Sequence, residues 1–174
     1  ILVIIKYAKF KDSRIESDII TSDNRIFFYT PLPYLKNGTY NLEIEAKSIF
    51  HPITGCDIQT SMIFGYDDSQ AVLYSGFTSN SDMVAKIYGT KGHIFIHKTW
   101  HMTEGYTIVK GHKKQVFENK TLGQSYSYEI MECHKCLREN EIESNLWSHQ
   151  NSMDLISILD SVRKKVSLKY PQEN

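Results

Sequence analysis

Apolar and polar side chains alternate along the middle of the chain, most regularly between residues 57 and 66. One side of this segment would carry Ile58, Thr60, Met62, Phe64 and Tyr66. Gln59 and Ser61 fall between them and would face the other way. A period of two residues is typical of a strand with one buried side. The pattern therefore predicts a half-buried strand in an antiparallel sheet.

Similar segments recur before and after this one, separated by short polar or glycine-containing links. The predicted strands are residues 1–10, 40–50, 58–66, 71–78, 83–88, 93–98, 106–110 and 115–118. In the link Gly89-Thr90-Lys91-Gly92, glycines at both ends would allow a positive φ where the chain reverses. Short links favour antiparallel neighbours. We therefore expect a sheet of about eight strands that forms a meander.

After residue 125 the apolar spacing lengthens to that of amphipathic helices. One stripe comprises Tyr126, Ile130, Cys133 and Leu137, and a second comprises Leu155, Leu159, Val162 and Val166. Both stripes predict helices whose apolar side packs on the sheet. Asn151 or Ser152 is placed to cap the second helix. Early strands and late helices indicate an α+β fold, a large predominantly antiparallel sheet with helices packed on one face and the other face open.

Length and charge narrow the range of partners. At 174 residues the chain is expected to form one domain, residues 1–174. Its 20 basic and 20 acidic side chains balance, which gives no electrostatic footprint for nucleic acid or for an anionic membrane surface. Small molecules and protein surfaces remain as expected partners. An odd number of cysteines, three, favours a reducing cytoplasm.

Two local motifs contain residues typical of a cofactor site or a metal site, but neither has all the residues that such a site needs. A nicotinamide-binding fold needs closely spaced glycines between a strand and a helix, whereas Gly89 and Gly92 lie between two predicted strands. We therefore expect this chain to bind neither NAD nor NADP. Cys133, His134 and Cys136 are metal-ligand types, but on a helix residue 134 points away from the other two. We expect no metal there and interpret Cys133 as a core residue.

One predicted strand carries a row of rings. His93, Phe95 and His97 alternate with Ile94 and Ile96, so the rings must lie on the sheet face opposite the aliphatic side chains. A solvated surface row is the simpler interpretation. A subunit interface is the alternative, because a sheet covered on one side leaves a broad open face. Catalysis by these histidines is the least favoured interpretation.

The segment Trp147-Ser148-His149-Gln150 precedes the second helix and holds the candidate binding residues. A buried Trp147 beside a polar helix start would explain the motif structurally. His149 could instead reach a substrate hydroxyl as a donor or a base. Trp147 and His149 are therefore the candidate substrate-binding residues, and no catalytic residue is assigned within this chain.

Several short motifs occur in an order typical of one enzyme family. They are Thr54-Gly55-Cys56-Asp57-Ile58-Gln59-Thr60-Ser61-Met62, the Gly89–Gly92 turn, Trp100, Tyr128-Glu129-Ile130, Ile142–Gln150, Leu159-Asp160 and Tyr170-Pro171. From about residue 45 onward the chain resembles the C-terminal domain of the glucose-fructose oxidoreductase, inositol dehydrogenase and MocA family, in its dihydrodiol dehydrogenase-like branch. The resemblance implies an NAD(P)-dependent oxidoreductase acting on a secondary alcohol of a sugar or cyclic diol. It also implies an N-terminal Rossmann domain that holds the cofactor and an acid/base lysine, and a homodimer formed through the open sheet face.

Residues 22–32 depart from the family pattern. Relatives carry an Asp and then a Tyr or His beside the substrate. When this chain is aligned with them on Pro31-Leu32, Ile26 stands at the Asp position and Thr30 at the Tyr or His position. Neither catalytic partner therefore carries over, and we expect a domain that has no turnover of its own. A stand-alone module for self-association or carbohydrate binding is the alternative. Sequence upstream of Ile1 would distinguish the two.

Overall fold

A computed structural model describes residues 3–8, 42–66, 69–102, 104–118, 120, 122–123 and 126–173. For residues 3–8 it describes the backbone alone. Residues 22–32, which depart from the family pattern, lie outside the described residues. Among the helices of the described ranges, none is long and apolar enough to cross a lipid bilayer.

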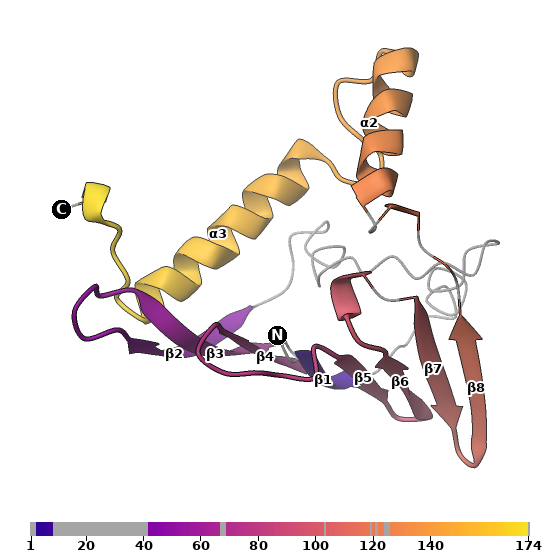
Figure 1. Ribbon diagram of the computed structural model, residues 1–174, viewed down its shortest axis with the longest axis horizontal. Helices are drawn as coiled ribbons and strands as arrows, with labels where there is room; N and C mark the ends of the chain where they lie inside the picture. Colours follow the sequence, from indigo (N-terminus) through magenta and orange to yellow (C-terminus); the bar gives the residue numbers. More distant parts are fainter. Residues whose placement is uncertain are drawn as a thin grey trace.

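Within the described ranges, the strands precede the two α-helices along the chain (Figure 1). The strands are β1 (Val3–Ala8), β2 (Glu43–Phe50), β3 (Asp57–Gly65), β4 (Gln70–Gly76), β5 (Ala85–Gly89), β6 (Gly92–Ile96), β7 (Gly105–Lys110) and β8 (Lys113–Glu118). The α-helices of the described ranges are α2 (Tyr126–Glu139) and α3 (His149–Lys165), with short 3-10 helices η2 (Trp100–Met102) and η4 (Pro171–Glu173). Every predicted strand is therefore confirmed, although the ends differ by up to three residues.

The strands form one sheet in the order β2-β3-β4-β1-β5-β6-β7-β8. Neighbours are antiparallel except β1 and β5, which run parallel. The meander prediction is wrong at one place, because β1 lies between β4 and β5. The backbone of Ile5 stands opposite Ala71 on one side and Ile87 on the other. Such non-local pairing leaves no trace in local residue spacing, which is why the sequence could not indicate it.

The core occupies one face of the sheet in two clusters. In one half, Phe64 of β3 stands opposite Ala71 of β4, and both are buried. In the other half, Ala85, Ile96 and Tyr106 stand side by side on β5, β6 and β7 and are also buried. The period-two prediction for β3 is therefore confirmed, since its buried positions alternate with more exposed ones.

Helix α3 covers the half of the sheet that contains β2 and β3 (Figure 1). Val162 is 7% exposed and belongs to the Phe64 and Ala71 cluster, and Ile158 packs against the same cluster. Leu159 is 47% exposed, so its predicted packing on the sheet is wrong. Because residues 158 and 159 are both apolar, spacing alone could not show which of them the helix turns inward.

The start of α3 also differs from the prediction. Ser148 is the N-cap, and its Oγ accepts a hydrogen bond from the backbone N–H of Asn151 at 3.2 Å. Asn151 and Ser152 lie inside the helix, so the prediction that one of them is the cap is wrong. Ser, Asp and Asn are all good caps, and several of them occur in succession here.

Helix α2 stands away from the sheet, on the same side as α3 (Figure 1). Its predicted packing stripe is exposed, with Tyr126 at 66%, Ile130 at 54% and Leu137 at 75%. Cys133 is exposed as well, so its interpretation as a core residue is wrong. The reason is that α2 contacts the following loop, residues 140–148, through a polar side that includes Glu132. The α+β class with a predominantly antiparallel sheet is confirmed.

The turn between β5 and β6 depends on close packing. Among the described residues the glycines with positive φ are Gly55, Gly111 and Gly123, so the positive φ expected in the β5–β6 link is not observed. A Cβ at Gly92 would collide with the backbone carbonyl oxygen of Val109 on β7. Glycine is required there because the two backbones approach so closely.

Candidate functional site

The two candidate residues from the sequence flank the cap of α3. Ser148 has an extended backbone, with φ −79° and ψ 164°, and from it the chain enters the helix. Trp147 is half-buried, and its Nε1 donates a hydrogen bond to Ser152 Oγ at 2.8 Å. The indole N–H is the only polar group of this side chain. The indole N–H of Trp147 is therefore used by Ser152 in the first turn of α3, and the aromatic ring is the part of the side chain that could contact a ligand.

His149 presents its ring to solvent, with 74% of the side chain exposed. Its backbone N–H donates to Glu143 Oε2 at 2.7 Å, and its ring Nδ1 lies 3.6 Å from the same oxygen. The carboxylate thus anchors the residue and leaves Nε2 without a partner within the described part of the chain. An imidazole held in this way can donate to or accept from a hydroxyl group. The binding role of Trp147 and His149 stays a prediction.

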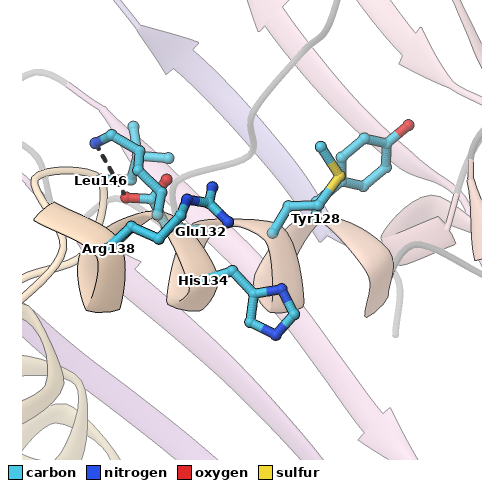
Figure 2. A pocket seen from close by; sticks show the side chains of 7 residues that line it. Tyr128, Glu132, His134, Arg138 and Leu146 are labelled. Carbon is cyan, nitrogen blue, oxygen red and sulfur yellow. Dashed lines mark ion pairs between the residues drawn. The ribbon is translucent and has the colours of Figure 1, made fainter.

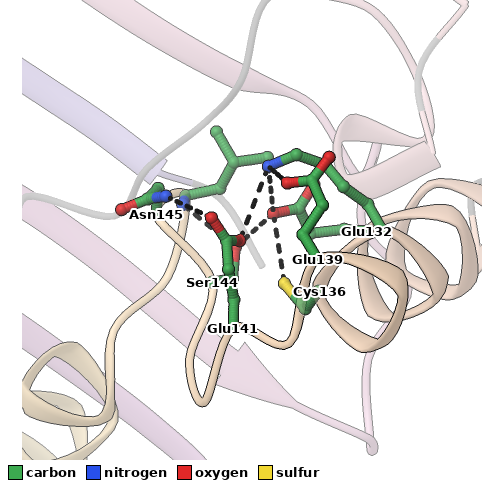
Figure 3. Close-up of polar contacts among 8 residues, drawn as sticks. Glu132, Cys136, Glu139, Glu141, Ser144 and Asn145 are labelled. Atoms are coloured by element: carbon green, nitrogen blue, oxygen red, sulfur yellow. Dashed lines mark hydrogen bonds and ion pairs between the residues drawn. The ribbon is translucent and has the colours of Figure 1, made fainter.

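A polar cluster joins α2 to the 140–148 loop that leads into this turn (Figure 3). Lys135 Nζ lies 3.9 Å from Glu132, 3.6 Å from Glu139 and 3.7 Å from Glu141. These carboxylates raise the pKa of Lys135, Glu132 contributing most. Ser144 Oγ donates a shorter bond of 2.6 Å to Glu132 Oε1. The loop is therefore held to α2 mainly by polar contacts.

A groove of about 520 Å³ runs beside this cluster (Figure 2). It is lined by Tyr128, Met131, Glu132, His134, Lys135, Arg138 and Leu146. Neither Trp147 nor His149 lines it, although Leu146 directly precedes Trp147. The groove and the α3 turn are therefore neighbouring but separate features.

The cysteine and histidine side chains of α2 do not gather into a metal centre. Cys136 Sγ lies 3.7 Å from Glu132 Oε1 as a hydrogen-bond donor. Burial, followed by the nearby Glu132 carboxylate, raises the pKa of this thiol. Metals bind the thiolate, so a raised pKa opposes coordination. In the described part of the chain no three His, Cys, Asp or Glu side chains converge, and we assign no metal.

Sequence reasoning missed a pair of buried donors above the second core cluster. Trp100 Nε1 and Tyr106 OH are buried and have no hydrogen-bond partner among the residues that the structure describes. Tyr106 is 4% exposed and stacks on Phe117, with ring centroids 4.7 Å apart. Burial raises the pKa of its phenol, so the group stays protonated and can donate. An unpaired buried donor costs about 1–3 kcal/mol, so these two groups differ from the other polar groups of the described core.

This donor pair lies on the helix side of the sheet. Leu73 packs against the first core cluster, and both Leu73 and Ala85 stand opposite Val3 in the strand register. Directly opposed residues share a face, so both clusters do as well. Trp100 packs against the cluster that contains Ala85 and Tyr106. The signal in the sequence was a Tyr at an inward position of an apolar strand, because a buried phenol needs a partner.

The predicted ring row lies on the opposite face. Ile96 is fully buried, whereas Phe95 stands opposite Lys86 and Thr107 on the neighbouring strands. Lys86 Nζ lies 5.7 Å from the Phe95 ring centroid, and the His97 ring lies 5.4 Å from it. His97 Nε2 is also hydrogen-bonded to Thr107 Oγ1 at 2.8 Å. The alternation is therefore confirmed, and use of this face as an interface stays a prediction.

The described residues do not fit a nicotinamide cofactor. Gly89 and Gly92 form the ends of the β5–β6 turn, and within the described ranges no strand runs through closely spaced glycines into a helix. A pyrophosphate needs that arrangement, because the helix start supplies free N–H groups. We therefore derive no chemical step from a cofactor in this chain.

Comparison with known proteins gives related enzymes and a shared fold. No family model matches the chain. It is 31% identical over 143 residues to the mouse (Mus musculus) trans-1,2-dihydrobenzene-1,2-diol dehydrogenase, a match that covers 75% of this chain and 41% of that protein. The Xenopus tropicalis protein of the same name is 31% identical over 145 residues, covering 78% and 43%. The chain therefore spans less than half the length of these curated relatives.

A solved structure extends the comparison to the fold. The crystal structure of aldose-aldose oxidoreductase from Caulobacter crescentus complexed with glycerol matches with a TM-score of 0.63, over 95% of this chain and 53% of that one. At 10% identity this likeness shows the fold alone. The chain is therefore similar in sequence to two dihydrodiol dehydrogenases over part of their length and shares the fold of an aldose-aldose oxidoreductase, which confirms the predicted resemblance to the C-terminal domain of the glucose-fructose oxidoreductase, inositol dehydrogenase and MocA family.

Proposed function

We propose that the chain is the substrate-binding and dimerising part of an NAD(P)-dependent oxidoreductase that acts on a secondary alcohol of a cyclic diol or sugar. The observation that carries this proposal is the 31% identity, across 75% of the chain, to a trans-1,2-dihydrobenzene-1,2-diol dehydrogenase. The fold shared with an aldose-aldose oxidoreductase supports a sugar as the other substrate class. In this proposal the cofactor and the acid/base group belong to another part of a longer enzyme.

The donor pair on the helix side supports a hydroxyl-bearing substrate. A diol or sugar oxygen accepts hydrogen bonds, and Trp100 N–H and Tyr106 O–H are buried donors that lack a partner in the described structure. The Tyr106 and Phe117 rings stack on each other, and Phe117 is the more exposed of the two. In this proposal the Phe117 ring would contact the carbon skeleton of a cyclic diol, and the two donors would fix its orientation.

In this proposal, Trp147 and His149 add a second edge to the site. The start of α3 and η2 lie on the same side of the sheet (Figure 1). The exposed ring of His149, anchored through Glu143, would contact a substrate hydroxyl from the solvent side. The half-buried ring of Trp147 would pack against the substrate's carbon skeleton.

A second copy of this chain is the proposed partner for the open sheet face. Ile63 and Val116 on that face are 44% and 52% exposed, although both are apolar. Val116 stands opposite Thr107, which in turn stands opposite Phe95, so Val116 lies on the same face as the ring row. A self-complementary patch of this kind suits a two-fold dimer.

An enzyme assay tests the substrate assignment. The longer protein encoded by the transcript that includes Ile1 is supplied with trans-1,2-dihydrobenzene-1,2-diol and with glucose, and the reduction of NAD and NADP is followed. Tyr106→Phe removes one donor and should lower kcat/KM roughly tenfold. Tyr88→Phe on the open face is the matched control and should leave kcat/KM unchanged. Equal activity of all three proteins would contradict the proposed site.

The isolated 174-residue chain tests the cofactor assignment separately. We expect titration calorimetry to show no sub-millimolar binding of NAD or NADP, because the described residues offer no pyrophosphate cradle. Tight binding of either cofactor to this chain would overturn the division of roles.

A stand-alone self-associating or carbohydrate-binding module is the second candidate. The ordered contacts of Lys86, Phe95 and His97 on the open face favour it, because they form a surface that needs no cofactor. The coding sequence upstream of Ile1 distinguishes the two. A βαβ segment with a glycine-rich loop supports the oxidoreductase, and a nearby start codon supports the module.

A further inference from the structure

The 140–148 loop has little apolar packing to hold it. Ile142 is 92% exposed and Leu146 is 45% exposed, so burial of these side chains contributes little to its position. The loop nevertheless ends in the Trp147–His149 turn. Its conformation must therefore depend on its polar contacts.

The shortest side-chain contact between the loop and α2 is a hydrogen bond to a carboxylate. Ser144 Oγ donates to the Glu132 carboxylate at 2.6 Å, and Glu132 is 21% exposed. Short bonds to a carboxylate are about twice as strong as neutral ones. The Lys135 ion pairs are 3.6–3.9 Å long and partly exposed, and exposed pairs of that kind are worth little.

The Glu132–Ser144 bond continues toward the turn. The backbone N–H of Leu146 donates to Ser144 Oγ at 3.0 Å, while the Ser144 hydroxyl donates onward to Glu132. Leu146 also lines the groove formed with Met131 on α2 (Figure 2). Leu146 is adjacent to Trp147, so the position of the turn is linked through Ser144 to one carboxylate of α2.

We propose that Glu132 is a positioning residue, which acts through Ser144 to hold the Trp147–His149 turn in place. This inference rests on the proposed function only where it assigns the turn to substrate binding. The coupling between α2 and the turn is independent of that assignment. Glu132 itself lies outside the proposed substrate contacts.

Nuclear magnetic resonance of the 174-residue chain tests the coupling. Glu132→Ala and Ser144→Ala should each shift the Trp147 indole N–H resonance and speed hydrogen exchange at the Leu146 and His149 amides by about tenfold. Glu132→Gln keeps an acceptor oxygen without the charge and should fall between Glu132→Ala and the parent chain. Unchanged signals in Glu132→Ala would overturn the proposal.

Glu139→Ala is the matched control. Glu139 lies on the same helix and contacts Lys135 at 3.6 Å, but within the described structure it makes no bond to the loop. We expect exchange at Leu146 and His149 to stay at the parent rate. If Glu139→Ala disturbs the turn as strongly as Glu132→Ala does, the Lys135 network holds the loop and the proposal is wrong.

Binding of trans-1,2-dihydrobenzene-1,2-diol to the longer protein separates this inference from the proposed function. Weaker binding by Glu132→Ala, with intermediate affinity in Glu132→Gln, supports both. Disturbed resonances with unchanged diol affinity would support the positioning role and contradict the assignment of the turn to the substrate site.

Discussion

Gly92 and Gly65 both belong to strands, yet only Gly92 is required to be glycine. A Cβ at Gly92 would collide with the Val109 carbonyl oxygen, whereas a Cβ at Gly65 would meet Glu43 Cβ at 3.5 Å, an ordinary contact. The difference comes from how closely the neighbouring backbone approaches. Residue identity at these positions therefore reports packing across the sheet.

Gly92→Ala should destabilise the fold by about 1–3 kcal/mol, because the β6 and β7 backbones must separate. Gly65→Ala, the control, should change the free energy of unfolding by less than about 1 kcal/mol. Denaturant titration of both variants measures the difference. Equal stabilities would show that the β6–β7 contact can relax freely.

Val162 and Leu159 give a second comparison at this scale. Val162→Ala removes two buried carbon groups and should cost about 2 kcal/mol, because the residue is 7% exposed in the Phe64 cluster. Leu159→Ala, at 47% exposure, should cost about 0.5 kcal/mol or less. Thermal unfolding followed by circular dichroism would rank them, and the reverse order would contradict the orientation of α3.

At the scale of elements, the end of α3 is tied to η4 by a compact polar contact. Arg163 donates to both carboxylate oxygens of Glu173 at 2.6 Å, and its guanidinium lies 4.2 Å from the Tyr170 ring centroid. Glu173 Oε2 also accepts the backbone N–H of Tyr170 at 2.9 Å. One carboxylate therefore fixes the short 3-10 helix to α3.

This contact should depend on pH. The Tyr170 N–H, and then the Arg163 guanidinium, lower the pKa of Glu173 in the folded chain. A lowered pKa means that the contact stabilises η4 above the ordinary glutamate pKa and is lost as the pH falls through the lowered value. The Tyr170 amide resonance should follow that titration, and Glu173→Gln should abolish it. A Tyr170 amide chemical shift that stays constant as the pH falls would contradict the assignment.

Much of the architecture could be predicted at the element scale, and the reasons for the exceptions are physical. Strand β3 could be predicted because alternation is local and its face is buried along its length. The outward orientation of Leu137 on α2 could not, because a polar loop contact decides it. Tyr106 and Trp100 were missed as donors, since an unpaired donor is recognised only once its surroundings are known.

At the scale of the whole molecule, the two faces of the sheet carry different kinds of side chain. The helix face carries both core clusters and the two donors that lack a partner among the described residues, and α3 covers one half of it. The opposite face carries the ring row of His93, Phe95 and His97 and exposed apolar side chains such as Ile63. We therefore expect small ligands on the first face and a second copy on the other.

Phe95→Asp should convert a dimer into a monomer, because it places a charge in the middle of the proposed contact. Light scattering after size-exclusion chromatography measures the mass. Ile142→Asp is the control, since Ile142 is 92% exposed on the 140–148 loop and lies off the sheet. A dimer that survives Phe95→Asp, or a parent chain that is monomeric at high concentration, would contradict the proposed interface.

The position of β1 has a consequence for how the chain reaches its native state. Strands β2–β4 and β5–β8 can each assemble from hairpins of nearby residues, but β1 must pair with β4 and β5 at once to join them. Closing a long stretch of chain costs more entropy than closing a hairpin, so we expect β1 to pair after the hairpins have formed. Before β1 pairs with them, β4 and β5 each have an edge with unpaired backbone groups. Such an edge can pair with a strand of another chain. The extent of aggregation during refolding should therefore depend on how fast β1 pairs with β4 and β5.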